Sequence, residues 1–171
     1  MADSVTFTKT SDKHTVYREI TPQIASLVAG ETDLIANLAN IAAVLKEAFG
    51  FFWVGFYFVK QDRLVLGPFQ GPLACTRINF DQGVCGHAYT IRQTTIVDNV
   101  DEFPGHIACS SASRSEIVVP IFRADGTVFG VLDVDSDRLA DFSAIDRDGL
   151  EAVARIIERF IQSHTNSANP G

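Results

Sequence analysis

The sequence lacks an excess of basic residues, any long apolar run and any paired-cysteine motif, and each absence narrows the possible functions. Lys and Arg total 14 against 21 Asp and Glu, and the formal net charge is −7. This charge argues against a general binder of nucleic acid or of anionic membranes, because both need an excess of positive charge. The apolar runs are only strand-sized, so we expect no membrane span. The N-terminal segment contains no apolar signal region, and the cytoplasm is the expected location.

Cysteine is also scarce, and its three copies do not make a disulfide framework. Cys75, Cys85 and Cys109 are widely spaced, and an odd number of cysteines in a reducing compartment leaves catalysis, metal binding or packing as roles. His87 and His106 could join them in a zinc site, but no C-x-x-C occurs and the usual spacing of zinc ligands is missing. We therefore expect no metal site.

The rest of the composition is that of one globular domain. Of the 171 residues, 46% are apolar, and the 13 phenylalanines supply material for a hydrophobic core. Both ends of the chain are polar and carry no regular pattern. We expect a flexible N-terminal arm over residues 1–13, a single domain over 14–164 and a flexible tail over 165–171.

Hydrophobic periodicity predicts helices near both ends of the chain and strands between them. Thr32 or Asp33 is the expected N-cap of the second helix, and Asp141 or Ser143 that of the last one. Pro22 is expected near the start of the first helix or at a kink. The predicted helices span 17–30, 32–50, 84–93 and 144–162, and the predicted strands span 51–59, 64–69, 76–80, 94–100, 116–122 and 128–136.

This order of elements indicates an α+β fold built on an antiparallel sheet. The N- and C-terminal helices are expected to pack on one face of that sheet. Two long loops, one over 67–86 and one around Cys109, carry the cysteines, and loops of such length commonly serve a function. We expect these loops to lie over a pocket on the other face.

Alternation along the strands sorts the side chains between the two faces. Trp53, Gly55 and Tyr57 share the face that is not uniformly apolar, and the glycine leaves a gap that could admit a ligand. Asp133 and Asp135 share a face in the same way, and two carboxylates this close repel each other unless a cation compensates. The expected pocket face therefore carries Trp53, Tyr57, Glu116, Asp133 and Asp135.

Each of these residues has a plainer interpretation when it is taken alone. Paired aspartates at a strand end are more often a solvated edge, and the two aromatic rings are more often packing. Glu116 alone is typical of a surface, and Cys85 alone is typical of a small buried hydrophobe. The convergence of acidic, aromatic and thiol groups favours a pocket. Such a pocket suits thiol redox chemistry on a cationic, partly apolar small molecule.

Several motifs together resemble the free methionine-(R)-sulfoxide reductases, a family of single GAF-domain enzymes. They are GPLACTRI, GVCGHA, VDNVDEFPGHIACSSASRSEIVVPIF and GVLDVDS, and the resemblance extends over residues 15–160. It includes all three cysteines, so it is far more specific than a generic GAF match. The resemblance implies a GAF-type antiparallel sheet. It also implies an oxidoreductase that reduces free L-methionine (R)-S-oxide to methionine through a cysteine sulfenic acid and an intramolecular disulfide.

The resemblance further implies a role for each functional residue. Cys109 would be the nucleophile, Cys75 the resolving thiol and Cys85 an auxiliary thiol. Glu116 would contact the sulfoxide oxygen and donate a proton as that oxygen leaves. The remaining implied substrate contacts are Asp133 and Asp135 at the ammonium group, and Trp53 and Tyr57 at the methyl-thioether end.

The resemblance also bears on partners and cofactors. It implies a thioredoxin-like dithiol reductant that reopens the disulfide, a role in oxidative stress, and no metal or organic cofactor. A homodimer is possible, and neither nucleic acid nor a membrane is an expected partner. Two alternatives stay open: a non-catalytic GAF sensor module that binds a small molecule, and a zinc-bound structural domain. Sensor modules usually sit beside an output domain, for which this chain has no room.

Overall fold

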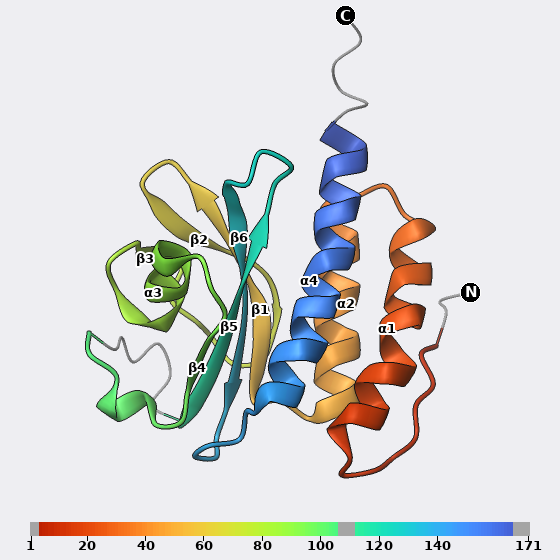
Figure 1. Ribbon diagram of the computed structural model, residues 1–171, viewed down its shortest axis with the longest axis horizontal. Coiled ribbons are helices and arrows are strands. Elements are labelled where there is room, and N and C mark those ends of the chain that lie inside the picture. The colour runs from red at the N-terminus through yellow and green to blue at the C-terminus, as the bar shows by residue number, and fades with distance from the viewer. Residues whose placement is uncertain (1–3, 106–111, 166–171) are drawn as a thin grey trace, which may run out of the picture.

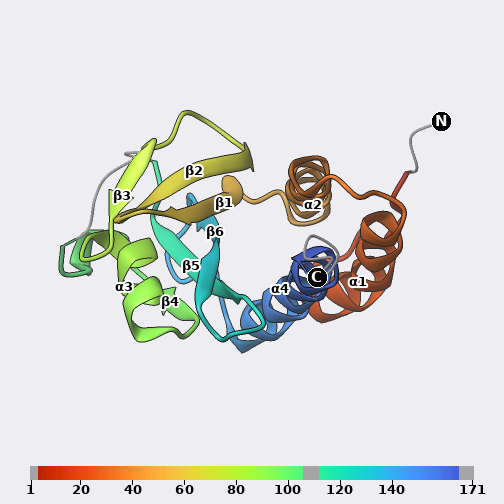
Figure 2. The ribbon, with the colours of Figure 1, turned by 90° about the horizontal axis from the view of Figure 1, so that it is seen from above.

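The computed structural model of the chain describes residues 4–105 and 112–165, and over these residues the fold is α+β, as the sequence predicted. Three helices pack together on one face of an antiparallel sheet, and a short helix lies on the other face (Figures 1 and 2). The three-helix layer comprises α1 (Lys13–Ala29), α2 (Leu34–Phe49) and α4 (Ala144–Thr165). The short helix is α3 (Gly83–Ile91).

The described residues form one six-stranded sheet in the order β3-β2-β1-β6-β5-β4, so β1, β6 and β5 lie at its centre. Each neighbouring pair is antiparallel. A short 3₁₀-helix, η1 (Val100–Glu102), follows β4 and was not predicted. The strands are β1 (Trp53–Lys60), β2 (Arg63–Gln70), β3 (Arg77–Asn79), β4 (Thr95–Val97), β5 (Ser115–Phe122) and β6 (Val128–Ser136).

The predicted helix caps are present. Asp33 accepts a hydrogen bond from the Ala36 backbone N–H at 2.8 Å, which fixes the start of α2. At α4, the Ser143 Oγ accepts a hydrogen bond from the Ile145 N–H at 3.2 Å. The Asp146 carboxylate in turn accepts a hydrogen bond from the Ser143 N–H at 2.9 Å. These two bonds cap the start of α4 in a variant of the capping box, with the N-cap side chain bonded to the second helical residue and Asp in the position that Glu or Gln more often takes.

The first helix begins earlier than predicted. Asp12 accepts a hydrogen bond from the His14 N–H at 3.1 Å, and α1 runs from Lys13, so Pro22 lies inside the helix and not near its start. The polar first turn hid this start from the apolar pattern. Residues 4–12 run along α1, where the backbone N–H of Thr8 donates to Glu19 at 2.7 Å. The flexibility of residues 1–13 and 165–171 and the domain limits at 14 and 164 stay predictions.

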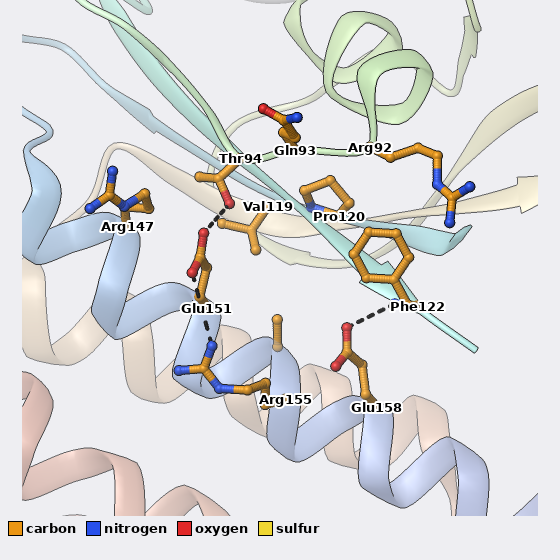
Figure 3. A pocket seen from close by; sticks show the side chains of 11 residues that line it. Arg92, Gln93, Thr94, Val119, Pro120, Phe122, Arg147, Glu151, Arg155 and Glu158 are labelled. Carbon is orange, nitrogen blue, oxygen red and sulfur yellow. Dashed lines mark hydrogen bonds and ion pairs between the residues drawn. The ribbon is translucent and has the colours of Figure 1, made fainter. Parts of the chain in front are cut away.

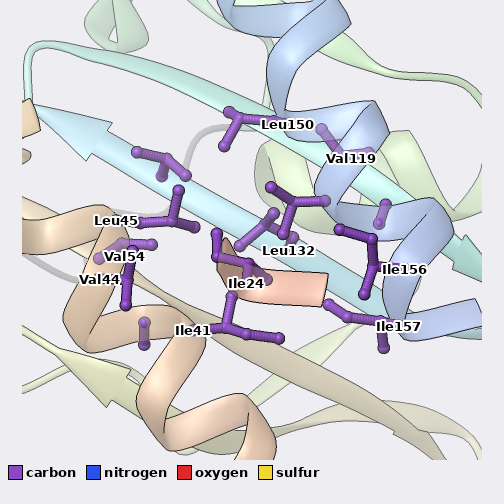
Figure 4. Packing of buried hydrophobic residues seen from close by; sticks show 14 of the residues in the cluster. Ile24, Ile41, Val44, Leu45, Val54, Val119, Leu132, Leu150, Ile156 and Ile157 are labelled. Carbon is purple, nitrogen blue, oxygen red and sulfur yellow. The ribbon is translucent and has the colours of Figure 1, made fainter. Parts of the chain in front are cut away.

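The main hydrophobic core lies between the sheet and the three-helix layer. Val54 of β1 and Leu132 of β6 point from the sheet towards Ile41 of α2 and Ile157 of α4 (Figure 4). These four side chains are at most 1% exposed, so the sheet is anchored to the helices along its central strands. The alternation that buries these residues turns their neighbours to the opposite face. No helix among the described residues is both long and apolar enough to cross a membrane.

Gly130 allows the two central strands to approach each other closely. A Cβ atom at this position in β6 would lie 2.3 Å from the Tyr57 carbonyl oxygen of β1. We therefore expect Gly130→Ala to destabilise the fold by about 1–3 kcal/mol, the usual cost of overpacking. Urea unfolding measures this change.

The matched control is Gly30→Ala at the end of α1. There φ is −89°, and a Cβ atom would meet nothing nearer than the Leu27 carbonyl oxygen at 3.6 Å. We expect little change in the free energy of unfolding for this variant. Equal stabilities of the two variants would contradict the close approach at Gly130.

Candidate active site

The register of the three central strands brings the predicted pocket residues onto one face. Trp53 of β1 lies opposite Asp135 of β6, which lies opposite Glu116 of β5. Gly55 lies opposite Asp133 in the next row of the same face. Directly opposed residues share a face of the sheet, and their side chains are neighbours. The predicted grouping of aromatic and acidic side chains opposite the three-helix layer is therefore confirmed.

A second hydrophobic cluster fills the space between this face and α3. Trp53 and Tyr57 are 4% and 2% exposed, and they pack there with Val84 and Ala88 of α3. Trp53 stacks on Phe69 of β2, with ring centroids 5.3 Å apart. The two aromatic residues are thus part of a packed layer.

The predicted gap at Gly55 is wrong. A Cβ atom at Gly55 would lie 2.6 Å from the Trp53 ring and 2.4 Å from the Cβ of Phe69. The glycine therefore makes room for these two side chains, and they occupy the space that we expected a ligand to enter. The error arose because Phe69 comes from the neighbouring strand, whose register could not be read from alternation along β1 alone.

The same two aromatic residues hold the loop that carries Cys75. The Trp53 indole N–H donates a hydrogen bond to the Pro72 carbonyl oxygen at 3.1 Å. The Tyr57 hydroxyl donates to the Cys75 carbonyl oxygen at 2.9 Å. Cys75 is half-buried. These two bonds join the aromatic layer directly to the backbone on which the predicted resolving thiol lies.

Beside the aromatic layer, a thiol and two carboxyl groups meet below α3. The Cys85 thiol lies 3.9 Å from a carboxylate oxygen of Glu116, at the outer limit for a sulfur hydrogen bond. The Cys85 sulfur and one carboxylate oxygen each of Glu116 and Asp133 all lie within 4.8 Å of one another, and the three residues are buried. One carboxylate oxygen of Asp133, Oδ1, is buried without a hydrogen-bond partner among the described residues. We refer to these three residues as the Cys85 cluster.

Burial and mutual repulsion raise the pKa values of the acidic groups. Burial raises the pKa of Glu116 well above its usual value, and the nearby charges of Asp133 and Asp135 raise it further. The pKa of Asp133 is raised by burial and then by the charge of Asp135. Burial raises the pKa of Asp135 to about 6, although a hydrogen bond with Ser113 opposes this rise. Burial, above all, also raises the pKa of the Cys85 thiol.

Cys109 and His106 lie outside the described residues, but the described residues on either side of them are hydrogen-bonded to the elements that carry Cys85 and Asp133. The Gly105 carbonyl oxygen accepts a hydrogen bond from the N–H of Gly83, the first residue of α3, at 3.0 Å. On the other side, the Arg114 N–H donates to the carbonyl oxygen of Ser136, the residue after Asp135, at 2.7 Å. Gly105 is therefore tied to α3 and Arg114 to the end of β6.

Another groove, of about 570 Å³, lies between α4 and the sheet and contains none of the predicted residues (Figure 3). Its carboxylates already have partners within the chain. Glu151 accepts a hydrogen bond from the Thr94 hydroxyl at 2.6 Å and pairs with Arg155, and Glu158 accepts one from the Phe122 backbone N–H at 2.9 Å. These bonds join α4 to β5 and to the segment before β4. The charged side chains of the groove are therefore explained by the packing of α4 on the sheet.

Sequence reasoning missed two contributors to the site. Ser113, which hydrogen-bonds to Asp135, lies in a serine-rich segment that offered no reason to choose one serine over another. Phe69 covers Gly55 from the neighbouring strand. In addition, Cys85 was singled out as a thiol, but no spacing in the sequence indicated that it would meet Glu116 and Asp133.

The comparisons with known proteins agree with the fold and with the motifs. Residues 28–162 match the model of the GAF domain family. The chain is 52% identical to GAF domain-containing protein A of Dictyostelium discoideum, over 92% of this chain and 99% of that protein. It is 41% identical to the free methionine-R-sulfoxide reductase of Escherichia coli, over 88% of this chain and 91% of that enzyme.

A solved structure gives the same result. The free methionine-R-sulfoxide reductase from Neisseria meningitidis, in complex with its substrate, superposes with a TM-score of 0.93 at 56% identity. The match covers 98% of this chain and 100% of that one. The chain therefore belongs to the GAF-domain family of free methionine-R-sulfoxide reductases.

Proposed function

We propose that the protein reduces free L-methionine (R)-S-oxide to methionine with its own thiols, through a sulfenic acid at Cys109 and a disulfide with Cys75. The family is one of oxidoreductases, and relatives named for this reduction match nearly the whole chain. The observation that carries the proposal is the group of three carboxyls on one sheet face, of which Glu116 and Asp133 are buried and Asp135 is half-buried. None of the ion pairs among the described residues includes any of these three carboxyl groups. The ammonium group of a substrate would supply the missing positive charge.

The first chemical step transfers oxygen from the substrate to the enzyme. The Cys109 thiolate attacks the sulfoxide sulfur, and Glu116 gives its proton to the sulfoxide oxygen. The hydroxyl passes to the Cys109 sulfur, the bond between the two sulfurs breaks, and methionine leaves with the electron pair. Cys109 is then a sulfenic acid. The raised pKa of Glu116 suits this role, because the carboxyl keeps its proton to a higher pH than an ordinary glutamate.

The second step recycles the nucleophile. The Cys75 thiol attacks the Cys109 sulfenic acid, water leaves, and a disulfide forms. An external dithiol then reduces this disulfide, and we propose a thioredoxin-like protein of the cytoplasm for this task. Tyr57 and Trp53 hold the loop of Cys75 at its backbone, which supports a defined approach of the second thiol. Cys85 is proposed as an auxiliary thiol, a role in oxidative stress follows from the reaction, and a homodimer stays a prediction.

The carboxyl pair explains a preference for the free amino acid. Among the described residues, the Oδ1 atom of Asp133 is buried without a hydrogen-bond partner, and Asp135 is only half-buried, so an ammonium group would satisfy both. A methionine within a peptide chain has no such ammonium. We propose that the methyl-thioether end of the substrate lies against the Trp53 and Tyr57 layer, where burial of a methyl group is favourable.

Replacement of Asp135 tests this recognition. A charge-assisted hydrogen bond to an ammonium contributes about 1.5–3 kcal/mol, so Asp135→Asn should lower kcat/KM for free methionine sulfoxide by about tenfold to a hundredfold. N-acetylmethionine sulfoxide has no ammonium. It should be a poor substrate of the wild type and should lose little more in the variant. The measurement is kcat/KM for both substrates with a dithiol.

Asp137→Asn is the matched control. Asp137 is exposed just beyond the end of β6, so the same Asp-to-Asn substitution is made there outside the site. We expect it to leave both values unchanged. Equal reduction of the acetylated and the free compound by the wild type would show that the ammonium is not recognised.

A further inference from the structure

The Cys85 cluster is also a set of metal ligands. Cys85 offers sulfur from α3, Glu116 offers oxygen from β5, and Asp133 offers oxygen from β6. The three atoms lie within 4.8 Å of one another. Donor atoms around a tetrahedral zinc ion are about 3.5 Å apart, given metal–ligand bonds of about 2.0–2.3 Å. Sulfur together with carboxylate oxygen is a ligand set that zinc accepts.

The surroundings of the cluster leave room for a positive charge. Asp133 is 6% exposed, and its Oδ1 atom has no hydrogen-bond partner within the described part of the chain. None of the ion pairs among the described residues includes Glu116 or Asp133. A buried carboxylate oxygen without a partner is costly, because that atom has lost its water and gained no hydrogen bond in return. A bound cation would remove that cost.

We propose that the Cys85 cluster binds a thiophilic divalent cation, with Zn²⁺ as the physiological candidate, in competition with the substrate. On binding, the Cys85 S–H bond and the Glu116 O–H bond break, both protons pass to the solvent, and the sulfur and one Glu116 oxygen each bond to the metal. One oxygen each of Glu116 and Asp133 completes three protein ligands, and the fourth position is left to water. No electron is transferred in this step.

The metal would inhibit the enzyme reversibly, and this part of the inference rests on the proposed function. A metal-bound Glu116 has no proton to give to the sulfoxide oxygen, and the positive charge of a metal ion on Asp133 repels the substrate ammonium. Sequence spacing predicted no metal site, because the three ligands are brought together only by the sheet register and by the packing of α3.

Direct binding tests the site without any measurement of activity. Reduced, metal-free protein is titrated with Zn²⁺ by calorimetry. Cd²⁺ serves as a second probe, because a cadmium–thiolate bond has a charge-transfer absorption in the ultraviolet. We expect one metal ion per chain, and Cys85→Ser should lose the absorption and bind at least about a hundredfold more weakly, since loss of mere outer-shell partners already costs about 10–100-fold.

Cys75→Ser is the matched control, and we expect it to bind metal like the wild type. Asp133→Asn, a change of nearly constant volume, should weaken binding without removing the thiolate absorption, and thermal unfolding verifies that each variant is folded. Absence of metal binding in the wild type would overturn the proposal. So would Cys85→Ser binding as tightly as the wild type, or Cys75→Ser losing as much affinity as Cys85→Ser.

Competition separates this inference from the proposed function. Free methionine sulfoxide, added to the titration, should raise the apparent Kd for Zn²⁺ in proportion to its concentration, and N-acetylmethionine sulfoxide should not. If Cys85-dependent metal binding is present but methionine sulfoxide has no effect on it, the metal site stands and the proposed substrate site fails. If methionine sulfoxide binds and turns over but no metal binds, the proposed function stands and the metal site fails.

Discussion

The Cys109→Ser variant is expected to form no methionine from free methionine sulfoxide, even in a single turnover with equimolar enzyme. A serine hydroxyl does not ionise near neutral pH, and it cannot accept oxygen to become a sulfenic acid. The described residues on either side of the Cys109 segment are hydrogen-bonded to the first residue of α3 and to the last residue of β6, the elements that carry Cys85, Asp133 and Asp135. Quantification of methionine by mass spectrometry after rapid mixing measures the effect.

Cys75→Ser is the comparison that isolates the nucleophile. Because attack on the sulfoxide precedes disulfide formation, this variant should still release about one methionine per enzyme in a single turnover. Its steady-state rate with a dithiol protein should fall sharply. A burst of methionine from Cys109→Ser would assign the attack to another cysteine, and an unchanged steady state in Cys75→Ser would assign resolution to Cys85 or to the reductant.

Glu116→Gln should slow the first step by about 10²–10⁴-fold, the usual contribution of a positioned general acid. Glutamine has nearly the same shape as glutamic acid, but its amide cannot transfer a proton to the departing oxygen. The side chain is 7% exposed in the wild type, between α3 and the sheet, and the substitution keeps that packing. The rate of methionine release in a single turnover, at saturating substrate, measures the loss.

The dependence on pH gives this variant a second signature. The pKa of Glu116 is raised, so the acid is protonated below that value and loses its proton as the pH rises through it. The first step in the wild type should therefore slow on the alkaline side, and Glu116→Gln should lack this decline. Glu47→Gln, on the exposed face of α2 across the sheet, is the control and should behave like the wild type. An alkaline decline that persists in Glu116→Gln would assign it to another group.

Alternation along single strands predicted which side chains share the pocket face, because the period of two is a property of each strand alone. Trp53, Asp135 and Glu116 form one row across the sheet, as that rule requires. The N-caps Asp33 and Ser143 could also be predicted, since capping is a local interaction between a side chain and the next turn.

Features that depend on packing between distant elements could not be predicted in this way. The meeting of Cys85 with Glu116 requires α3 to lie across β5, and nothing in the local sequence of either element specifies that crossing. The role of Gly55 depends on Phe69 of the neighbouring strand. The raised pKa of Glu116 follows from burial and from two other carboxyls, and alternation gave their common face but not how far the overlying helix would bury them.

The most direct test of the account is the fate of racemic free methionine sulfoxide incubated with the wild-type protein and a dithiol. Chiral chromatography and quantification of methionine give the outcome for each epimer at sulfur. The account predicts that the (R) epimer is converted to an equal amount of methionine and that the (S) epimer remains. Binding of the sulfoxide without formation of methionine, as a non-catalytic sensor module would show, or consumption of both epimers alike, would contradict it.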